Sequence, residues 1–321
     1  MIRETMATGP MSWEAETLMA NDGKIELSDE CLAELRALAA ELEANPLPVE
    51  ALSADDFPMP RCREVMASVR QTLDSGLGFA IIDRMPLDDF EPATATKLYW
   101  LLISLCGPIV AQKWAGAMVY DVTDTGRKAA AGNGVRGSKT NQSQGYHTDN
   151  CFGLPPDYVA MLCLQPAKIG GISGLITFDS VHNHLLEKDR DLLARLYQPF
   201  HVDRQREHAP NDSPIARQIV FDYDGETLRV ALSSELNHQG YVMAGEEMDE
   251  TGKAALAAIG EVMEQPGLGK VFDFERGQIQ IVNNRRLGHR RTAYEDGPDP
   301  AQKRHLVRLW VRHQGRAFYH G

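Results

Sequence analysis

The sequence predicts a mixed α+β protein in which a double-stranded β-helix, or jelly roll, forms the core and helices flank it. Two observations lead to this prediction. From Ala111 onward the 321-residue chain consists mainly of short strand-like runs and loops, whereas the part before it shows mainly helical patterns. Many short strands with a few helices are typical of a jelly roll with helical additions. No repeat and no linker divides the chain, so one domain is expected.

Three helices are expected before that point. Ser28 is a suitable N-cap for an amphipathic stripe of leucines, and this first helix ends before Pro46. A second helix is expected over about 61–75, ending at a glycine, and a third over 92–105, beginning with a proline. Residues 78–83 lie between them as a short β-rich run, the first candidate strand of the core.

The second half of the chain alternates strand candidates with turn signals. Asp224-Gly225 lies between two apolar runs, a pattern that favours a β-hairpin. Helices are expected over about 180–196 and 249–264. The strand candidates are residues 159–164, 175–178, 219–221, 228–231, 278–282 and 305–311.

Two segments carry few helix or strand signals. Residues 1–26 contain Gly9-Pro10 and Asn21-Asp22-Gly23, so they are predicted to form a mobile or loosely packed arm before a single domain at 27–321. Residues 127–145 are rich in small and charged side chains. A loop of this length is functional or disordered, and both alternatives stay open: a lid over a site, or a segment without a function.

Composition and charge exclude several classes of function. The net charge of −12 argues against a nucleic-acid-binding surface, which needs clustered positive charge. No apolar run approaches the roughly 20 residues that cross a bilayer, and the N-terminus lacks the apolar segment of a secretion signal. The cysteines are odd in number and scattered, which predicts reduced thiols and a cytoplasmic protein; they are Cys31, Cys62, Cys106, Cys151 and Cys163.

Two short motifs far apart in the chain predict a metal site. The first contains His147 and Asp149, whose spacing suits an extended segment because residues two apart project to one face of a strand. The second ends at His289, which follows the 278–282 strand candidate. Two histidines and one carboxylate leave open positions on a metal, the arrangement of non-haem Fe(II) oxygenases. A His-x-Asp alone is a weak signal, and a polar surface pair is the alternative.

The C-terminal stretch reverses the acidic character of the whole chain. Arg304 and Arg308 lie four residues apart in or next to a strand candidate, a spacing that keeps both side chains on one face. Their apolar neighbours predict partial burial, where a charge needs a partner; surface ion pairs are the alternative. Cationic density beside a metal suggests anionic ligands. The basic residues are Arg285, Arg286, Arg290, Arg291, Lys303, Arg304, Arg308, Arg312 and Arg316.

Two further chemical groups are discounted. His182 and His184 form a His-x-His, but they fall in a predicted helix, where residues two apart do not share a face. Cys151 lies beside the His-x-Asp motif, yet no base is placed near it, so a packing role is favoured over a nucleophilic one.

Three blocks of the sequence carry a resemblance to a known family. They are Gly145-Tyr146-His147-Thr148-Asp149-Asn150, the run from Leu162 to Ser173 that contains Gly170-Gly171, and Asn284 through His289 and Tyr294 to Arg304, Arg308 and Trp310. With these blocks in the expected order and with the expected separations, the sequence between residues 78 and 312 resembles the taurine dioxygenase-like (TauD/TfdA) family of Fe(II)/2-oxoglutarate oxygenases, whose core is a cupin-like jelly roll.

The resemblance implies roles for individual residues. It makes His147, Asp149 and His289 the iron ligands, and Arg304 the partner of the distal carboxylate of 2-oxoglutarate. Ser173 replaces a family threonine that assists this contact, and keeps its hydroxyl. Arg308 is expected to meet a substrate anion or the cosubstrate. The expected substrate contacts are Gln112, Trp114, Tyr146 and Arg308.

By the same resemblance the protein is a dioxygenase that uses Fe(II), 2-oxoglutarate and O2. It is expected to hydroxylate a C–H bond of a small polar, carboxylate-bearing or amino-acid-like molecule, with release of succinate and CO2. Asp149 disfavours halogenation, for which relatives carry a small residue at this position. Desaturation, epimerisation, a hydrolytic or isomerising metal enzyme, and a non-oxygenase metal-binding jelly roll remain alternatives. Dimers and larger homo-oligomers are common among such enzymes.

Overall fold

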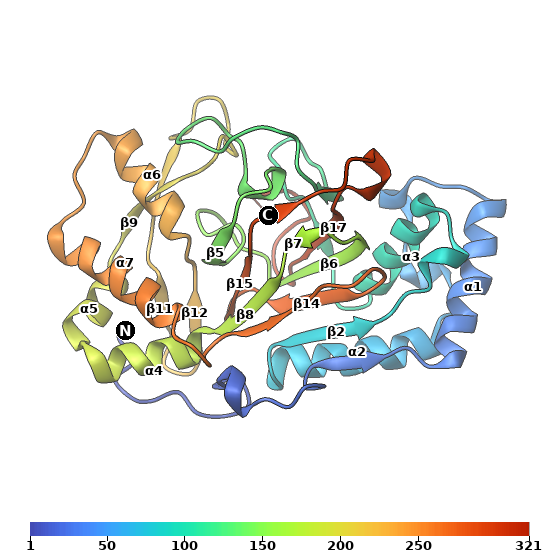
Figure 1. Ribbon diagram of the computed structural model, residues 1–321, viewed down its shortest axis with the longest axis horizontal. Coiled ribbons are helices and arrows are strands. Elements are labelled where there is room, and N and C mark those ends of the chain that lie inside the picture. The colour runs from blue at the N-terminus through green and yellow to red at the C-terminus, as the bar shows by residue number, and fades with distance from the viewer. Residues whose placement is uncertain (321) are drawn as a thin grey trace.

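The computed structural model describes residues 1–320 and shows two β-sheets with helices on both sides (Figure 1). Helices α1–α3 lie at the right of Figure 1 and α4–α7 at the left, with the sheets between them. Side chains from both sheets line a single cavity. This is the mixed helix-and-sheet architecture, with a jelly-roll core, that the sequence predicts.

The larger sheet has seven strands and is antiparallel except at its β1–β2 edge. Its order is β1-β2-β14-β6-β17-β3, and β4 also pairs with β17. The central strands β14, β6 and β17 are almost wholly buried, which explains why they read as apolar runs. The bounds are Lys24–Glu26 (β1), Phe79–Asp83 (β2), Ile109–Val110 (β3), Tyr120–Val122 (β4), Tyr158–Gln165 (β6), Ile279–Asn283 (β14) and His305–Val311 (β17).

The smaller sheet has four antiparallel strands in the order β13-β8-β15-β5. Its register places His289 opposite His147 on one side and opposite Leu175 on the other. Three two-stranded pairs complete the strands. The bounds are Gln144–His147 (β5), Ser173–Thr177 (β8), Lys270–Phe272 (β13), Leu287–Arg291 (β15), Ile169–Gly170 and Tyr294–Glu295 (β7, β16), Phe200–Asp203 and Ile215–Gln218 (β9, β10), and Phe221–Tyr223 and Leu228–Val230 (β11, β12).

The helices form two layers, one on each sheet. One apolar cluster joins α1–α3 to β2, β6, β14 and β17, and another joins α4, α5 and α7 to the outer face of the smaller sheet. Apolar faces buried in this way contribute most of the stability of such helices. The bounds are Asp29–Ala44 (α1), Pro60–Ser75 (α2), Pro92–Ser104 (α3), Phe178–Lys188 (α4), Arg190–Leu196 (α5), Ser234–Ala244 (α6) and Glu250–Met263 (α7), with 3-10 turns at Ala15–Thr17, Val49–Ala51, Ala54–Asp56, Leu87–Asp89, Gly137–Lys139 and Pro300–Gln302.

Most of the expected elements are present, and the differences have local causes. The hydroxyl of Ser28 accepts from the Cys31 amide at 3.2 Å, as expected of an N-cap. The helix expected over 180–196 is two helices, because Asp189 leaves the helical conformation and its side chain caps α5 instead. The sequence did not predict α6, in which apolar and polar residues are mixed without a clear apolar stripe.

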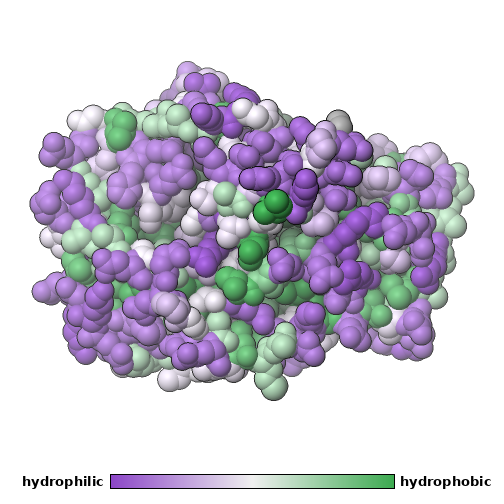
Figure 2. Space-filling model, in the orientation of Figure 1, coloured by the Kyte–Doolittle hydropathy of each residue, from purple (hydrophilic) through white to green (hydrophobic). Residues whose placement is uncertain are grey.

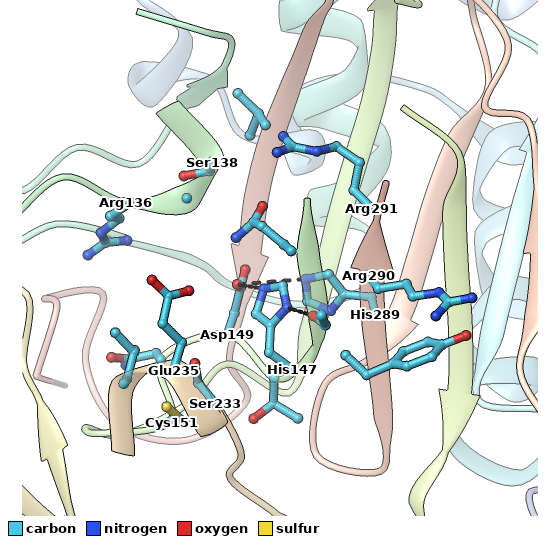
Figure 3. A pocket seen from close by; sticks show the side chains of 18 of the residues that line it. Arg136, Ser138, His147, Asp149, Cys151, Ser233, Glu235, His289, Arg290 and Arg291 are labelled. Carbon is cyan, nitrogen blue, oxygen red and sulfur yellow. Dashed lines mark hydrogen bonds and ion pairs between the residues drawn. The ribbon is translucent and has the colours of Figure 1, made fainter. Parts of the chain in front are cut away.

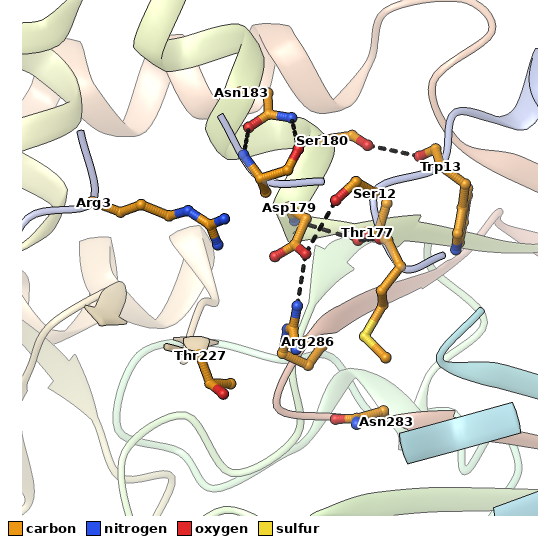
Figure 4. Close-up of polar contacts among 12 residues, drawn as sticks. Arg3, Ser12, Trp13, Thr177, Asp179, Ser180, Asn183, Thr227, Asn283 and Arg286 are labelled. Carbon is orange, nitrogen blue, oxygen red and sulfur yellow. Dashed lines mark hydrogen bonds and ion pairs between the residues drawn. The ribbon is translucent and has the colours of Figure 1, made fainter. Parts of the chain in front are cut away.

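Part of the N-terminal arm, residues 1–26, contacts α4 and the segment before β2 (Figure 4). Asn183 on α4 exchanges two hydrogen bonds with the Ala7 backbone, at 2.6 and 2.9 Å. Ser180 donates to the Trp13 carbonyl at 2.7 Å, and the Trp13 indole donates to the Leu77 carbonyl at 2.8 Å. The arm therefore ties α4 to the segment before β2.

The surface is mainly polar. Hydrophilic side chains dominate the face shown in Figure 2, and the apolar ones that reach it gather near its centre. Among residues 1–320, no helix combines the length and the apolar character that crossing a membrane requires.

Candidate active site

His147, Asp149 and His289 converge on the inner side of the smaller sheet (Figure 3). His147 ends β5, and His289 lies opposite it in the middle of β15. The Nε2 atom of each histidine is 3.7 Å from Asp149 Oδ1, and the three ligand atoms lie within 4.8 Å of one another. Asp149 itself lies two residues beyond the end of β5, so the expected extended segment covers only the histidine.

The Asp149 carboxylate is held through its other oxygen. Oδ2 accepts from Trp310 Nε1 at 2.8 Å and from Arg308 Nη1 at 2.9 Å, both on β17. Burial alone would raise the pKa of Asp149, but the Arg308 cation and the hydrogen bond from Trp310 outweigh it and hold that pKa well below its usual range. Asp149 is therefore an anion with one oxygen fixed and Oδ1 free to bind a cation.

Both histidines are suited to be neutral ligands. His147 Nδ1 lies 2.9 Å from the Gly145 carbonyl, which can only accept, so Nδ1 carries the proton and Nε2 presents its lone pair. Burial and the neighbouring His147 lower the pKa of His289 to about 3. Two neutral imidazoles and a carboxylate form the donor set of a facial triad, and these residues fit Fe(II).

A cavity of about 430 Å³ extends from these three residues between the two sheets. This is an ordinary size for a site that binds small molecules. Besides the triad it is lined by polar and charged side chains from both sheets, α6 and the loop before β5. Those that bear on its chemistry are Arg136, Ser138, Ser173, Gln205, Glu235, Gln280, Arg291, Arg304 and Arg308.

Arg304 and Ser173, the expected partners of the distal carboxylate, both belong to this cavity. Both are buried and line the cavity, Ser173 from β8 and Arg304 from the residue before β17. Arg304 Nη1 is buried and has no hydrogen-bond partner among the described residues. A buried guanidinium with a free donor is suited to a ligand carboxylate, in agreement with the role that the resemblance implies.

The expected substrate contacts are placed differently. Gln112 is fully buried outside the cavity lining, where its Oε1 accepts from Arg308 Nε at 2.8 Å. Trp114 is 45% exposed, also outside the lining, and packs on His320. Gln112 is thus a support for Arg308, and neither residue contacts the cavity. Their role as substrate contacts stays a prediction.

Tyr146 and Arg308 both line the cavity, and both also contact other parts of the protein. The Tyr146 ring belongs to the apolar cluster on the outer face of the smaller sheet, because strand residues alternate and His147 faces inward. Its ring lies under Arg290, 4.5 Å from the guanidinium. Arg308 does line the cavity, but it pairs with Asp149 rather than standing free for an anion.

Several cavity residues were not predicted from the sequence. Arg136 and Ser138 come from the 127–145 loop, and Glu235 comes from the first turn of α6. Figure 3 shows the Glu235 carboxylate directed into the cavity. Trp310 was seen only as an apolar neighbour. Its position two residues after Arg308 on one strand was the signal that both share a face.

The 127–145 loop forms one wall of the cavity and is attached at several points. Arg136 Nη2 lies 2.9 Å from Glu207 Oε1, which also pairs with Lys113 at 2.6 Å. The Gly132 amide donates to Asp203 Oδ2 at 3.1 Å. The loop is therefore held over the site by acidic side chains of a neighbouring segment.

With the fold and site described, comparison with known proteins gives the family. The family model described as "Taurine catabolism dioxygenase TauD, TfdA family" matches residues 43–310, so the chain belongs to this family. It is 28% identical over 316 residues to FR-33289 synthase of Streptomyces rubellomurinus (strain ATCC 31215), covering 97% of this chain and 92% of that protein. It is 24% identical over 309 residues to the taurine hydroxylase-like protein SAT17 of Stachybotrys chartarum (strain CBS 109288 / IBT 7711), covering 93% and 78%.

Solved structures show the same fold. Asparagine oxygenase in complex with Fe(II), 2S,3S-3-hydroxyasparagine and succinate superposes with a TM-score of 0.69 at 18% identity, over 90% of this chain and 93% of the other. The non-heme iron oxygenase OrfP in complex with Fe and alpha-ketoglutaric acid gives 0.66 at 15% identity, over 91% and 94%.

The protein is therefore a non-haem iron oxygenase that depends on 2-oxoglutarate and O2. Family membership supplies the class of reaction, and the two histidines with Asp149 supply a donor set that fits the metal. The predicted family, fold and cofactors are confirmed.

Proposed function

We propose that this enzyme hydroxylates a C–H bond of a small amino-acid-like or other carboxylate-bearing metabolite, with release of succinate and CO2. The observation that carries the proposal is the joint presence, in one cavity, of the His147–Asp149–His289 cluster and of buried arginines that lack an acidic partner. Neither a structural metal site nor a hydrolytic one needs the second feature.

We assign the metal to His147, Asp149 and His289, and the distal carboxylate of 2-oxoglutarate to Arg304 with Ser173. When bound, iron and 2-oxoglutarate supply the oxidising power that removes a hydrogen atom from the substrate and returns a hydroxyl group. The side chains of the protein place these groups and exclude competing reactions.

The protein's own contribution at the metal end is orientation. Trp310 and Arg308 hold Oδ2 of Asp149, so the carboxylate presents Oδ1 without rearranging. Gln112 in turn holds Arg308 by accepting from Nε and by donating to the Arg308 carbonyl at 2.7 Å. Such fixed partners keep a ligand near its productive geometry.

The substrate class rests on charge. The Glu235 carboxylate lines the cavity on the α6 side and bonds only to the Gln239 side chain, at 3.0 Å, which leaves it available for a substrate amino group. Arg136, which also lines the cavity, is already paired with Glu207, so Glu235 is the charged group that bears on the substrate class. Asparagine oxygenase, and OrfP in complex with (3S)-hydroxy-L-Arg, carry amino-acid products and support the same class. Desaturation or epimerisation is the alternative outcome, because it needs the same residues.

Three further expectations belong to this proposal. We infer that residues 127–145 act as a lid, since they form a cavity wall held by the Arg136–Glu207 pair. Residues 27–321 are proposed as one domain because both sheets line one cavity. A cytoplasmic location is supported by five free cysteines, which suit a reducing compartment.

The first experiment is a titration of Fe(II)-loaded protein with 2-oxoglutarate under argon, following the weak visible charge-transfer band of the Fe(II)–keto-acid chelate. The band is expected in the wild type and absent in His147→Ala. His184→Ala, at a histidine that pairs with Glu14 on the surface, is the matched control and should keep the band. No band in iron-loaded wild type would contradict the proposal. Succinate release in the presence of L-amino acids then identifies the substrate.

A further inference from the structure

We propose that Arg291 is a second anion-binding arginine for the distal carboxylate of 2-oxoglutarate, and that the same guanidinium links this carboxylate to the backbone in front of His147. The inference rests on the proposed function and deepens it. It concerns a residue two positions beyond His289 that neither the sequence motifs nor the resemblance singled out.

The register of the smaller sheet brings Arg291 to Ser173. These two residues are directly opposite on β15 and β8, so their side chains share the inner face. Arg304 approaches from β17, and the guanidinium groups of Arg291 and Arg304 lie 4.8 and 5.2 Å from the centroid of the same Tyr294 ring. Two cations and one hydroxyl thus surround one end of the cavity (Figure 3 shows Arg291).

The charges at this end are not balanced by the protein. Arg291 is 6% exposed and Arg304 is 3% exposed, and neither forms an ion pair with an acidic side chain among residues 1–320. The other arginines on the cavity do: Arg308 pairs with Asp149, and Arg290 pairs with Glu264 at 2.6 Å. Buried cations of one sign placed side by side are unfavourable unless an anion lies between them.

The free donors indicate where that anion binds. Nε and Nη1 of Arg291 and Nη1 of Arg304 are buried without a hydrogen-bond partner among the described residues. Nε and Nη1 of Arg291 do not form one bidentate fork, because the amino group beside Nε–H is Nη2; each offers one charge-assisted hydrogen bond to an oxygen. One carboxylate between the two guanidinium groups would use a donor of each and neutralise part of the charge.

The remaining amino group of Arg291 is used differently. Nη2 donates to the Thr140 carbonyl at 3.1 Å and also to the Gln142 carbonyl. Residues 140–142 end the 127–145 loop and directly precede β5, which carries His147. A carboxylate that fixes Arg291 therefore also fixes the approach to one histidine of the metal site. Keto acids without a second carboxylate would lack this effect.

The test compares two keto acids on Fe(II)-loaded protein under argon. 2-Oxoglutarate has the distal carboxylate, whereas 2-oxobutyrate has only the keto-acid end. Arg291→Met is expected to lower the affinity for 2-oxoglutarate on the order of 10- to 100-fold, the effect of losing charge-assisted hydrogen bonds. The affinity for 2-oxobutyrate should stay within about twofold of the wild-type value. Arg291→Lys, which keeps the charge but not the planar fork, should give an intermediate affinity. Arg312→Met is the matched control, a buried arginine outside the cavity whose donors bind the Phe318 and Arg316 carbonyls.

The outcomes separate the possibilities. If Arg291 only supports the backbone, Arg291→Met lowers the affinity for both keto acids alike, and the inference is overturned. Equal affinity for 2-oxoglutarate in wild type and variant overturns it as well. Failure of wild-type protein to bind 2-oxoglutarate would instead remove the proposed function. Should Arg291→Met not fold, Arg291→Lys decides by the same ratio. Amide exchange gives an independent measure: 2-oxoglutarate, but not 2-oxobutyrate, should slow exchange at residues 140–147 in the wild type.

Discussion

The two ends of the cavity solve the problem of buried charge in opposite ways. At the metal end, Asp149 is paired with Arg308 and bonded to Trp310, and Arg308 is bonded to Gln112. At the distal end, Arg291 and Arg304 lie next to Ser173 with free donors and no acidic partner. The protein pairs its own charges where a ligand must be oriented, and leaves two cations without an acidic partner where a ligand anion must bind.

This difference has energetic consequences. A buried donor without a partner costs about 1–3 kcal/mol, and more when it is charged. The distal end is therefore destabilising until an anion arrives, and the binding energy of that anion is coupled to stability. The charges at the metal end are paired, so removing one partner there leaves the other buried and uncompensated. Mutations at the two ends should differ in sign as well as in size.

The largest effect is expected from Asp149→Ala. This change removes a proposed metal ligand and leaves Arg308 buried without its anion, so metal binding should be abolished and stability reduced by about 3–5 kcal/mol. Calorimetric titration with Fe(II) or Mn(II) and urea denaturation measure the two effects. Retention of metal affinity within tenfold would mean that Asp149 is not a ligand.

Arginine variants at the two ends give the sharpest comparison. Arg308→Met should destabilise the metal-free protein by about 3–5 kcal/mol because Asp149 loses its cation. Arg304→Met should leave the stability of the metal-free protein unchanged or raise it slightly. The same variant should lower the affinity for 2-oxoglutarate about 100-fold, because it removes a bidentate contact. Urea midpoints with and without 2-oxoglutarate measure both. Equal destabilisation by the two variants would break the comparison.

Trp310→Phe tests orientation alone. The variant keeps the ring and the Arg308–Asp149 pair but removes the indole donor to Oδ2. Outer-shell partners of this kind typically contribute about 10- to 100-fold in metal affinity, and the lower end is expected here because Arg308 remains. Iron affinity should fall while 2-oxoglutarate affinity at saturating metal stays within about twofold. A fall in cosubstrate affinity alone would place Trp310 at the wrong end of the cavity.

The sequence allowed the fold class and the convergence of the His147, Asp149 and His289 motifs to be predicted, because those depend on alternating patterns and on residue types with few other uses. Their roles as iron ligands stay a prediction that the titrations test. Gln112 shows the limit. It is 196 residues from Arg308 in the chain, and only the β3–β17 edge of the larger sheet brings the two together.

The N-terminal arm shows the same limit. Glycine and proline in residues 1–26 indicate irregular backbone, which the structure has, but irregular backbone need not be mobile. The partners of Ala7 and Trp13 lie on α4, 176 and 167 residues away. The polar side chains of α4 that make these bonds cannot be recognised locally, because Ser180 and Asn183 would suit an exposed helix face equally well.

The smallest predicted effect comes from a buried histidine outside both ends of the cavity. His182 on α4 is fully buried, accepts or donates one hydrogen bond to Tyr197 at 2.9 Å, and has a free Nδ1. Burial lowers its pKa to about 4, from about 6.5. Unlike Arg291, this histidine is neutral when buried, so it needs no anion as a partner.

This histidine predicts a pH dependence of stability. Below pH 6.5 the unfolded chain binds a proton that folded His182 does not accept until about pH 4, so its contribution is complete above pH 6.5 and is lost as the pH falls towards 4. Between pH 7.5 and 5.5 the loss should be about 1 kcal/mol, and His182→Asn should remove it. Urea denaturation at both pH values measures the difference. The control is His184→Asn, which replaces a partly exposed histidine two residues further along α4. If His182→Asn keeps the wild-type pH dependence while His184→Asn loses it, His182 is not the source of that dependence. The contrast between a buried group that stays neutral and buried arginines that need an anion would then not apply to α4.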